Sequence, residues 1–345
     1  MFSELTRDRF RRFRGIRRAW WSLLILSIAF VLSLFSEFLA NDKPLILRHQ
    51  GKTYFPVVRF YPESNFGLPN ATEADYLALN KDASFKSSGG WMLFPPVHWG
   101  PYRAHLDLEG NPPHPPSRQH WLGTDNTARD VLSRLLYGFR LCMVFALVIA
   151  ILAAALGILI GGLQGYVGGW TDMLGQRFIE IWSAMPELYL LIIFSAVFDP
   201  SISLLLILLG LFGWMGLSDY VRAEFLRNRQ MDYVRAARAL GLGPLQIIWR
   251  HVLPNSMTPV VTFLPFRMSA AILALTSLDF LGLGVPPGTP SLGEMLAQGK
   301  NNIDAWWISM STFALLVLTL LLLTFMGDAL RNALDPRLQD SEVSS

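Results

Sequence analysis

Few side chains in this 345-residue sequence suggest catalysis or metal binding by their type and spacing. Four histidines fall within one polar segment and are the candidates for metal ligation: His98, His105, His114 and His120. Imidazole nitrogens are common metal ligands, but prolines separate these four and their spacing is irregular. The sequence leaves two interpretations open, a metal site and surface histidines that make ordinary hydrogen bonds.

The motifs for nucleotide or zinc chemistry are incomplete. Gly51-Lys52-Thr53 matches the end of a phosphate-binding loop, but Ile46 stands where its first glycine is required. A zinc-protease His-Glu-x-x-His does not occur. We therefore expect no catalytic residue, cofactor or metal in this chain, and expect any ATP hydrolysis to come from a separate subunit.

Three charged residues lie in or beside apolar runs: Glu187, Arg267 and Asp279. Burial of a charge in a membrane is costly, so such residues usually face a cavity or a partner. Pro186 precedes Glu187 and predicts a kink there. Two interpretations stay open for the three residues, a translocation cavity and buried structural pairing.

The stretch Ser218–Asn255, here named the elbow, carries six arginines between apolar runs. Its pattern predicts two short helices. Gly241 ends the first in a left-handed conformation, and Pro244 opens the second. Ala236, Ala237 and Gly241 form a bend of small residues that lets another protein approach the backbone.

The second elbow helix is predicted to carry one apolar face. Its members follow helical spacing: Leu245, Ile248, Trp249 and Val252. Pro254 is expected to stop this helix.

The elbow resembles the cytoplasmic loop of ABC importer permeases, whose pattern is E-A-A-x3-G-x9-I-x-L-P. Ala236-Ala237, Gly241 and Leu253-Pro254 fall at the expected spacing. Arg235 replaces the glutamate and His251 the isoleucine, as is usual in the dipeptide/oligopeptide/nickel permease family. The resemblance implies coupling to an ATPase subunit through these residues: Arg235, Ala236, Ala237, Leu240, Gly241, Leu242, Leu245, Leu253 and Pro254. The alternative is a basic loop bound to anionic lipid phosphates.

Two further signatures extend this resemblance over roughly residues 118–334. Trp121-Leu-Gly-Thr-Asp125 and Arg129–Gly138 match a segment that precedes the second membrane helix in the family. Leu278–Pro286 matches another, with Asp279 where members usually carry serine. The long segment 41–117 resembles the longer C-type permeases of the peptide importers used by microcin C.

Composition indicates a polytopic membrane protein, and the resemblance implies that it is all-α. The chain is 52% hydrophobic and only 16% charged, against about 25% charged residues in soluble domains. Seven arginines in Met1–Arg18 predict a cytoplasmic N-terminus, and no cleavable signal peptide is expected. The one cysteine, Cys142, cannot form an intrachain disulfide.

Hydropathy and the resemblance predict six membrane helices of the ABC importer permease fold, with a small irregular periplasmic subdomain between the first two. The predicted helices are Trp20–Leu39, Leu141–Leu163, Phe178–Phe198, Ser201–Leu217, Val260–Leu281 and Trp307–Leu330. The expected parts are a cytoplasmic segment 1–18, a first span 19–40, a periplasmic segment 41–138, a five-helix core 139–332 with the coupling loop 218–255, and a cytoplasmic tail 333–345.

The resemblance implies a permease subunit that moves peptides into the cytoplasm by alternating access across the bacterial inner membrane. It implies a second homologous permease, two ATPase subunits or one fused ATPase that bind ATP and Mg²⁺, and a periplasmic peptide-binding protein. The lipid bilayer is a further partner, and nucleic acid is not. Two alternatives are a secondary transporter, which would need inverted repeats, and a membrane-anchored periplasmic enzyme.

Overall fold

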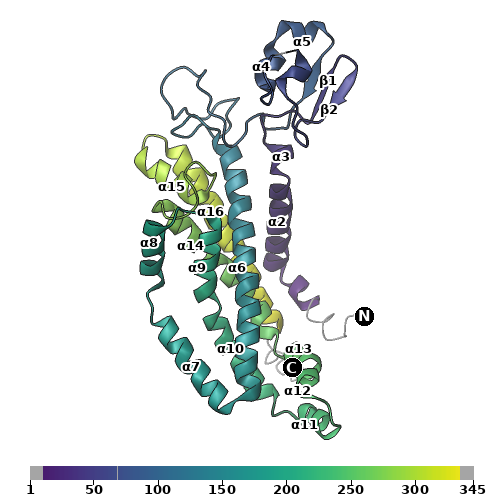
Figure 1. Cartoon of the computed structure of the whole chain (residues 1–345), viewed down its shortest axis with the longest axis vertical. Helices are drawn as coiled ribbons and strands as arrows, with labels where there is room; N and C mark the ends of the chain where they lie inside the picture. The colour runs from purple at the N-terminus through teal and green to yellow at the C-terminus, as the bar shows by residue number, and fades with distance from the viewer. Residues whose placement is uncertain (1–10, 68, 335–345) are drawn as a thin grey trace. The chain divides into compact units, whose positions relative to one another are not determined.

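The computed structural model describes residues 11–67 and 69–334 and is mostly helical (Figure 1). Its chain forms two compact units. The helical unit comprises residues 1–27, 142–286 and 317–345, and the strand unit comprises residues 28–141 and 287–316. Part of the predicted basic N-terminus (1–10) and most of the predicted tail (335–345) lie outside the described residues.

Five helical stretches of the described chain are long and apolar enough to cross a membrane. They are α2 (Arg17–Leu34), α6 (Val131–Val167), α9 with α10 (Ile202–Gly213 and Met215–Asn228), α14 (Thr258–Phe280) and α16 (Trp306–Leu334). Each overlaps one of the six predicted spans. The polytopic, mainly helical character expected from composition is therefore confirmed.

The third predicted span, Phe178–Phe198, is divided in the structure. Helix α7 (Gly169–Ser183) has 15 residues and α8 (Glu187–Val197) has 11, so neither reaches the length of a simple span. Pro186 separates them in an extended conformation, with φ −73° and ψ 103°. A proline has no backbone N–H to continue the helix, so the predicted kink becomes a complete break.

Helix α10 extends well beyond the predicted end at Leu217. Three glycines spaced four apart on α6, Gly157, Gly161 and Gly165, let α10 approach closely. A Cβ at Gly161 would lie 2.2 Å from the Ser218 carbonyl oxygen, and one at Gly165 would lie 2.6 Å from the Arg222 carbonyl oxygen. Small residues at this spacing are typical of tightly packed membrane helices.

The elbow forms the two predicted helical arms. Helix α11 (Asp232–Ala239) ends at Gly241, whose φ of +79° confirms the predicted left-handed conformation. Leu242 donates a backbone hydrogen bond of 3.2 Å to Ala237, which satisfies a carbonyl at the helix end. The second arm is α12 (Pro244–Ile247), a π turn (Ile248–Val252) and α13 (Leu253–Asn255). Helix α13 includes Pro254, so Pro254 does not stop this arm as predicted.

The predicted apolar face of the second arm is wrong. Ile247 and Val252 are buried, whereas Leu245 and Trp249 are 73% and 69% exposed. The π turn holds an extra residue per turn and rotates later side chains relative to a regular 3.6-residue helix.

The elbow's buried side belongs to one apolar cluster of the helical unit. Its fully buried members are Leu217, Val221, Phe225, Val234, Ala237, Ile247, Val252 and Val260. Ala237 is only 3% exposed, so the prediction that it forms part of a small-residue docking surface is wrong. Its place in this buried cluster accounts for its small side chain instead.

The strand unit contains a three-stranded antiparallel sheet in the order β2-β1-β3. The strands are β1 (Ile46–His49), β2 (Lys52–Tyr54) and β3 (Trp91–Leu93). Short helices surround them: α3 (Ser36–Leu39), a 3₁₀ turn (Glu63–Phe66), α4 (Tyr76–Lys81) and α5 (Ala83–Ser87). A small core of Leu47, Phe66, Ala74, Tyr76, Leu79 and Phe85 holds this part together.

A network of buried ion pairs involves the signature segment that begins at Trp121. Arg134, on α6, is completely buried and lies 2.5 Å from Glu294 and 3.3 Å from Asp125. Arg129 also contacts both carboxylates, at 2.9 Å to Asp125 and 3.4 Å to Glu294. Glu294 lies on α15 (Leu292–Asn301), so the network joins segments about 160 residues apart.

Two of the four histidines come together in an aromatic cluster. The His120 ring nitrogen Nδ1 lies 2.9 Å from Asp130, and the rings of Trp99, His105 and His120 are 4.3–5.0 Å apart. Among the described residues, no group of three or more His, Cys, Asp or Glu residues is arranged to hold a metal ion. The described geometry therefore favours structural histidines.

The His105 cluster predicts acid sensitivity of the strand unit. Burial, followed by the nearby His120, lowers the pKa of His105 from 6.5 to about 4. Between these values the unfolded chain binds a proton that the folded chain does not, so stability falls as pH drops from 6.5 to 4. We expect a loss of about 2 kcal/mol after allowance for solvent screening.

His105→Phe should remove this part of the pH dependence, measured by hydrogen exchange of residues 41–138 between pH 7 and 4.5. His98→Phe, at an exposed position, is the control and should keep the wild-type slope. Identical slopes for wild type and His105→Phe would contradict the assignment.

Candidate functional site

The outer surface of the elbow carries large apolar side chains that stay exposed among the described residues (11–67 and 69–334). Leu240, Leu245 and Trp249 are 82%, 73% and 69% exposed. They flank the bend at Gly241, on the opposite side from the buried Val234, Ala237 and Ile247. We name Leu240, Leu245 and Trp249 the apolar trio. All three are large apolar side chains on the exposed side of the elbow.

The elbow also carries several arginines whose contacts the structure gives. Arg235 lies 3.6 Å from the exposed Asp232, a contact that contributes little to stability because water screens it. Arg238 stacks over the Tyr166 ring at 5.7 Å, and Arg229 donates a 3.1 Å hydrogen bond to the Tyr166 carbonyl. These contacts fix the base of the elbow on α6 while its outer surface stays basic.

The structure divides the nine predicted coupling residues into two groups. Arg235, Ala236, Leu240, Gly241, Leu245 and Pro254 are exposed. Leu242 and Leu253 are partly buried against the elbow's core, and Ala237 is buried within it. Trp249 was assigned to the apolar face and not to the coupling set, yet its exposure places it with Leu240 and Leu245.

Glu187 and Arg267 line one small cavity in the helical unit, of about 180 Å³. Glu187 is the first residue of α8, and Arg267 lies in the middle of α14. The remaining walls are Ile149, Leu209, Phe212, Gly213, Ala270, Ala271 and Ala274. The two predicted cavity charges are thus brought together in apolar surroundings.

The Arg267 guanidinium donates a hydrogen bond to the Gly213 carbonyl. Gly213 ends α9, just before the break at Trp214, so this carbonyl lies at an interruption of the span. No ion pair within 4 Å joins Glu187 to Arg267 among the described contacts. The cavity can therefore present both an anion and a cation to a bound molecule.

Asp279 lies apart from this cavity and holds a turn. It is 7% exposed and accepts a 2.7 Å hydrogen bond from the Val285 backbone N–H. A Cβ at Gly284 would overlap the Asp279 carboxylate, which explains the glycine there. Of the two interpretations for Asp279, this geometry favours the structural one.

Comparison with known proteins agrees with these features. The model of the family described as "Binding-protein-dependent transport system inner membrane component" matches residues 153–340. The inner membrane ABC transporter permease protein YejE of Escherichia coli K12 is 49% identical over 97% of this chain and 98% of its own. The peptidoglycan transport system permease protein YejE of Agrobacterium fabrum C58 is 45% identical over 97% of this chain and 94% of its own.

A solved structure of the inward-facing MetNI methionine ABC transporter is also similar, over 56% of this chain and 94% of that chain, at 18% identity and a TM-score of 0.44. The family match and the two permease relatives support the expected ABC permease over a secondary transporter or a periplasmic enzyme. Such a membrane component is a non-catalytic subunit, and ATP is hydrolysed elsewhere. The chain belongs to the family of inner membrane components of binding-protein-dependent transport systems.

Proposed function

We propose that this chain is one permease subunit of an ATP-driven importer that moves peptides from the periplasm to the cytoplasm. Its relatives include a peptidoglycan transport permease and putative peptide transport permeases at 39% identity over 65% of this chain. The apolar trio on a basic elbow is the observation that carries the proposal, because an importer subunit without an ATPase must dock one. A peptide of the microcin C type is a candidate substrate, from the resemblance of segment 41–117.

The proposed assembly has three kinds of protein partner. A second permease completes the pathway, and two ATPase subunits, or one fused ATPase, bind ATP and Mg²⁺ beneath both permeases. A periplasmic peptide-binding protein delivers the substrate. In this assembly the elbow is the contact with the ATPase, and the Glu187–Arg267 cavity lies on the translocation pathway.

The proposed topology counts α7 and α8 as the third of six spans, broken at Pro186. The break is compatible with a membrane only where protein or a water-filled cavity covers it, and the cavity lined by Glu187, the residue after Pro186, supports this proposal. Arginine-rich segments then lie inside, with both termini and the elbow in the cytoplasm. The strand unit's segment 41–138 lies in the periplasm.

Cysteine labelling in intact spheroplasts tests this topology. In a Cys142→Ala background, cysteines at the exposed positions Ser88 and Ile303 should react with an impermeant maleimide. A cysteine at the exposed Gln230 should react only after lysis. Labelling of Gln230→Cys before lysis would reverse the proposed orientation.

Docking through the apolar trio predicts that Leu240→Glu uncouples the transporter. A leucine buried on docking contributes about 1.5–3 kcal/mol, and a buried carboxylate adds a desolvation cost. We expect peptide uptake below about one-tenth of wild type and loss of ATPase subunits during purification, with normal membrane abundance. Leu240 lies outside the elbow's buried core, so the fold should persist.

Leu106→Glu is the matched control, because Leu106 is 83% exposed but lies on the strand unit. It should leave uptake and ATPase retention unchanged. Full uptake by Leu240→Glu would contradict the proposal that the elbow couples this chain to the ATPase.

The cavity predicts that Arg267→Gln and Glu187→Gln each lower uptake about tenfold while the ATPase subunits remain bound. Both changes remove a charge that the cavity presents, and interaction of a substrate with an ionised group is worth about 1.5–3 kcal/mol. Uptake and co-purification are measured together. Ser269→Ala, on the same helix but outside the cavity lining, is the control. Wild-type uptake by both charge variants would contradict the proposal that the Glu187–Arg267 cavity lies on the translocation pathway.

A further inference from the structure

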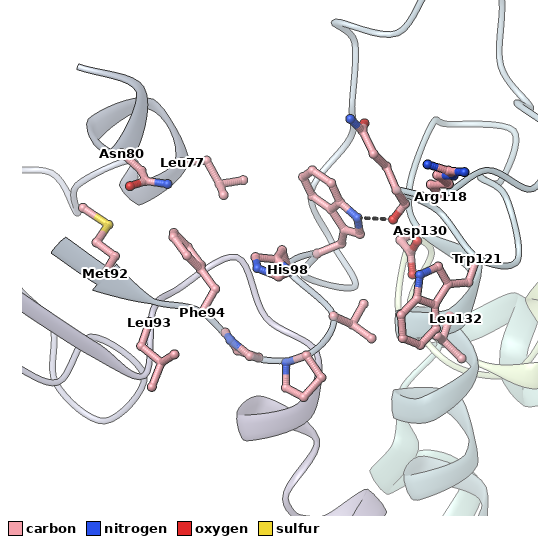
Figure 2. Close-up of a pocket in the computed structure, with 15 residues that line it drawn as sticks. Leu77, Asn80, Met92, Leu93, Phe94, His98, Arg118, Trp121, Asp130 and Leu132 are labelled. Atoms are coloured by element: carbon pink, nitrogen blue, oxygen red, sulfur yellow. Dashed lines mark hydrogen bonds between the residues drawn. The ribbon is translucent and has the colours of Figure 1, made fainter. Parts of the chain in front are cut away.

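The strand unit contains an open cavity of about 860 Å³ (Figure 2). Its walls come from α4, from β3 and the segment after it, from residues 118–121 and from the start of α6. All lining residues precede residue 153, where the family match begins. The cavity therefore lies outside the part of the chain that matches the family's membrane component.

The cavity lining includes several apolar and aromatic side chains beside polar ones. Trp121, one of the lining residues drawn in Figure 2, is 61% exposed. Trp99 is held by a 2.7 Å hydrogen bond from its indole nitrogen to the Gln119 carbonyl, and Phe94 packs on the strand unit's core. Pro95 and Pro96 follow Phe94 and restrict the backbone. A rigid wall of this kind lowers the entropy cost of binding.

One cation on the cavity wall is available to a ligand. Arg118 is exposed, and no ion pair with it occurs among the described residues. The nearest acidic lining residue, Asp130, is 1% exposed. Both Asp130 oxygens are occupied, by the Ser133 backbone N–H at 2.8 Å and by His120 at 2.9 Å. The cavity thus favours an anionic group beside an apolar one.

A strand edge borders the cavity. Strand β3 pairs with β1 on one side and has no second strand partner among the described residues. Met92 and Leu93 of β3 belong to the cavity lining. An extended peptide can add to such an edge through main-chain hydrogen bonds, while pockets receive its side chains.

We propose that this cavity binds the transported peptide in extended form, with its C-terminal carboxylate on Arg118 and an apolar side chain against Trp121. The inference rests on the proposed peptide importer. A free carboxylate distinguishes a transported peptide from an internal loop of a folded partner. The volume lies within the range of about 300–1,000 Å³ that small-ligand sites occupy.

Binding to the purified transporter in nanodiscs, without binding protein or ATP, tests the proposal. The probes are fluorescein-labelled Ala-Ala-Phe-Leu-Phe with a free C-terminus and the same peptide amidated. Wild type should bind the free acid about tenfold more tightly than the amide. Arg118→Gln should abolish that preference, and Arg118→Lys should restore part of it. Trp121→Ala should weaken both peptides about tenfold.

Two variants of the same unit serve as controls. Arg59→Gln and Phe60→Ala change exposed residues outside the cavity lining and should bind as wild type does. Equal binding of acid and amide by wild type, or an unchanged preference in Arg118→Gln, would overturn the proposal. ATP-driven uptake with binding protein present is measured separately. Uptake without binding in the cavity would overturn only this inference, and absence of uptake would contradict the importer itself.

Discussion

The apolar packing beneath the elbow is the constraint on which the coupling account depends. Val234, Ala237, Ile247 and Val252 bury one side of the elbow against Val221 and Phe225 of α10 and Val260 of α14. A loop joined to the protein only at its two ends would move by itself when a partner displaced it, without moving the helices. Because close-packed interiors transmit strain, the proposed coupling requires this packing to pass a displacement of the elbow to both helices.

The same two helical stretches reach the Glu187–Arg267 cavity. The span of α9 and α10 contributes Gly213, and α14 contributes Arg267, which bonds the Gly213 carbonyl. The elbow connects these stretches in the chain, and the close α6–α10 contact at Gly161 and Gly165 provides a fixed neighbour. The buried side of the elbow and the charged cavity are therefore built on the same two stretches, α9 with α10 and α14.

The sequence predicted features that depend on local chemistry. Five spans follow from hydropathy, and the positive φ of Gly241 follows from the need to end α11. The position of the elbow as a candidate site followed from its arginines and the spacing of Ala236, Gly241 and Pro254. The family resemblance that rests on these residues agrees with the match over residues 153–340.

Features that depend on irregular helices or distant contacts could not be predicted in this way. The π turn at Ile248–Val252 aligns Val252 with Ile247 on the buried side, away from Leu245 and Trp249, and Pro186 divided a helix that hydropathy alone joins. The burial of Ala237 depends on tertiary packing, although its small size was evident. The pairing of β1 with β3 across about 40 residues leaves no periodic signal in such short strands.

Photo-cross-linking from position 249 tests the central claim most directly. Replacement of Trp249 by p-benzoylphenylalanine keeps a large aromatic side chain at an exposed position of the apolar trio. In membranes that contain the assembled transporter, illumination should join this chain to an ATPase subunit. The adduct should disappear when the ATPase is omitted. Adducts confined to lipid, with the ATPase present and active, would contradict the account.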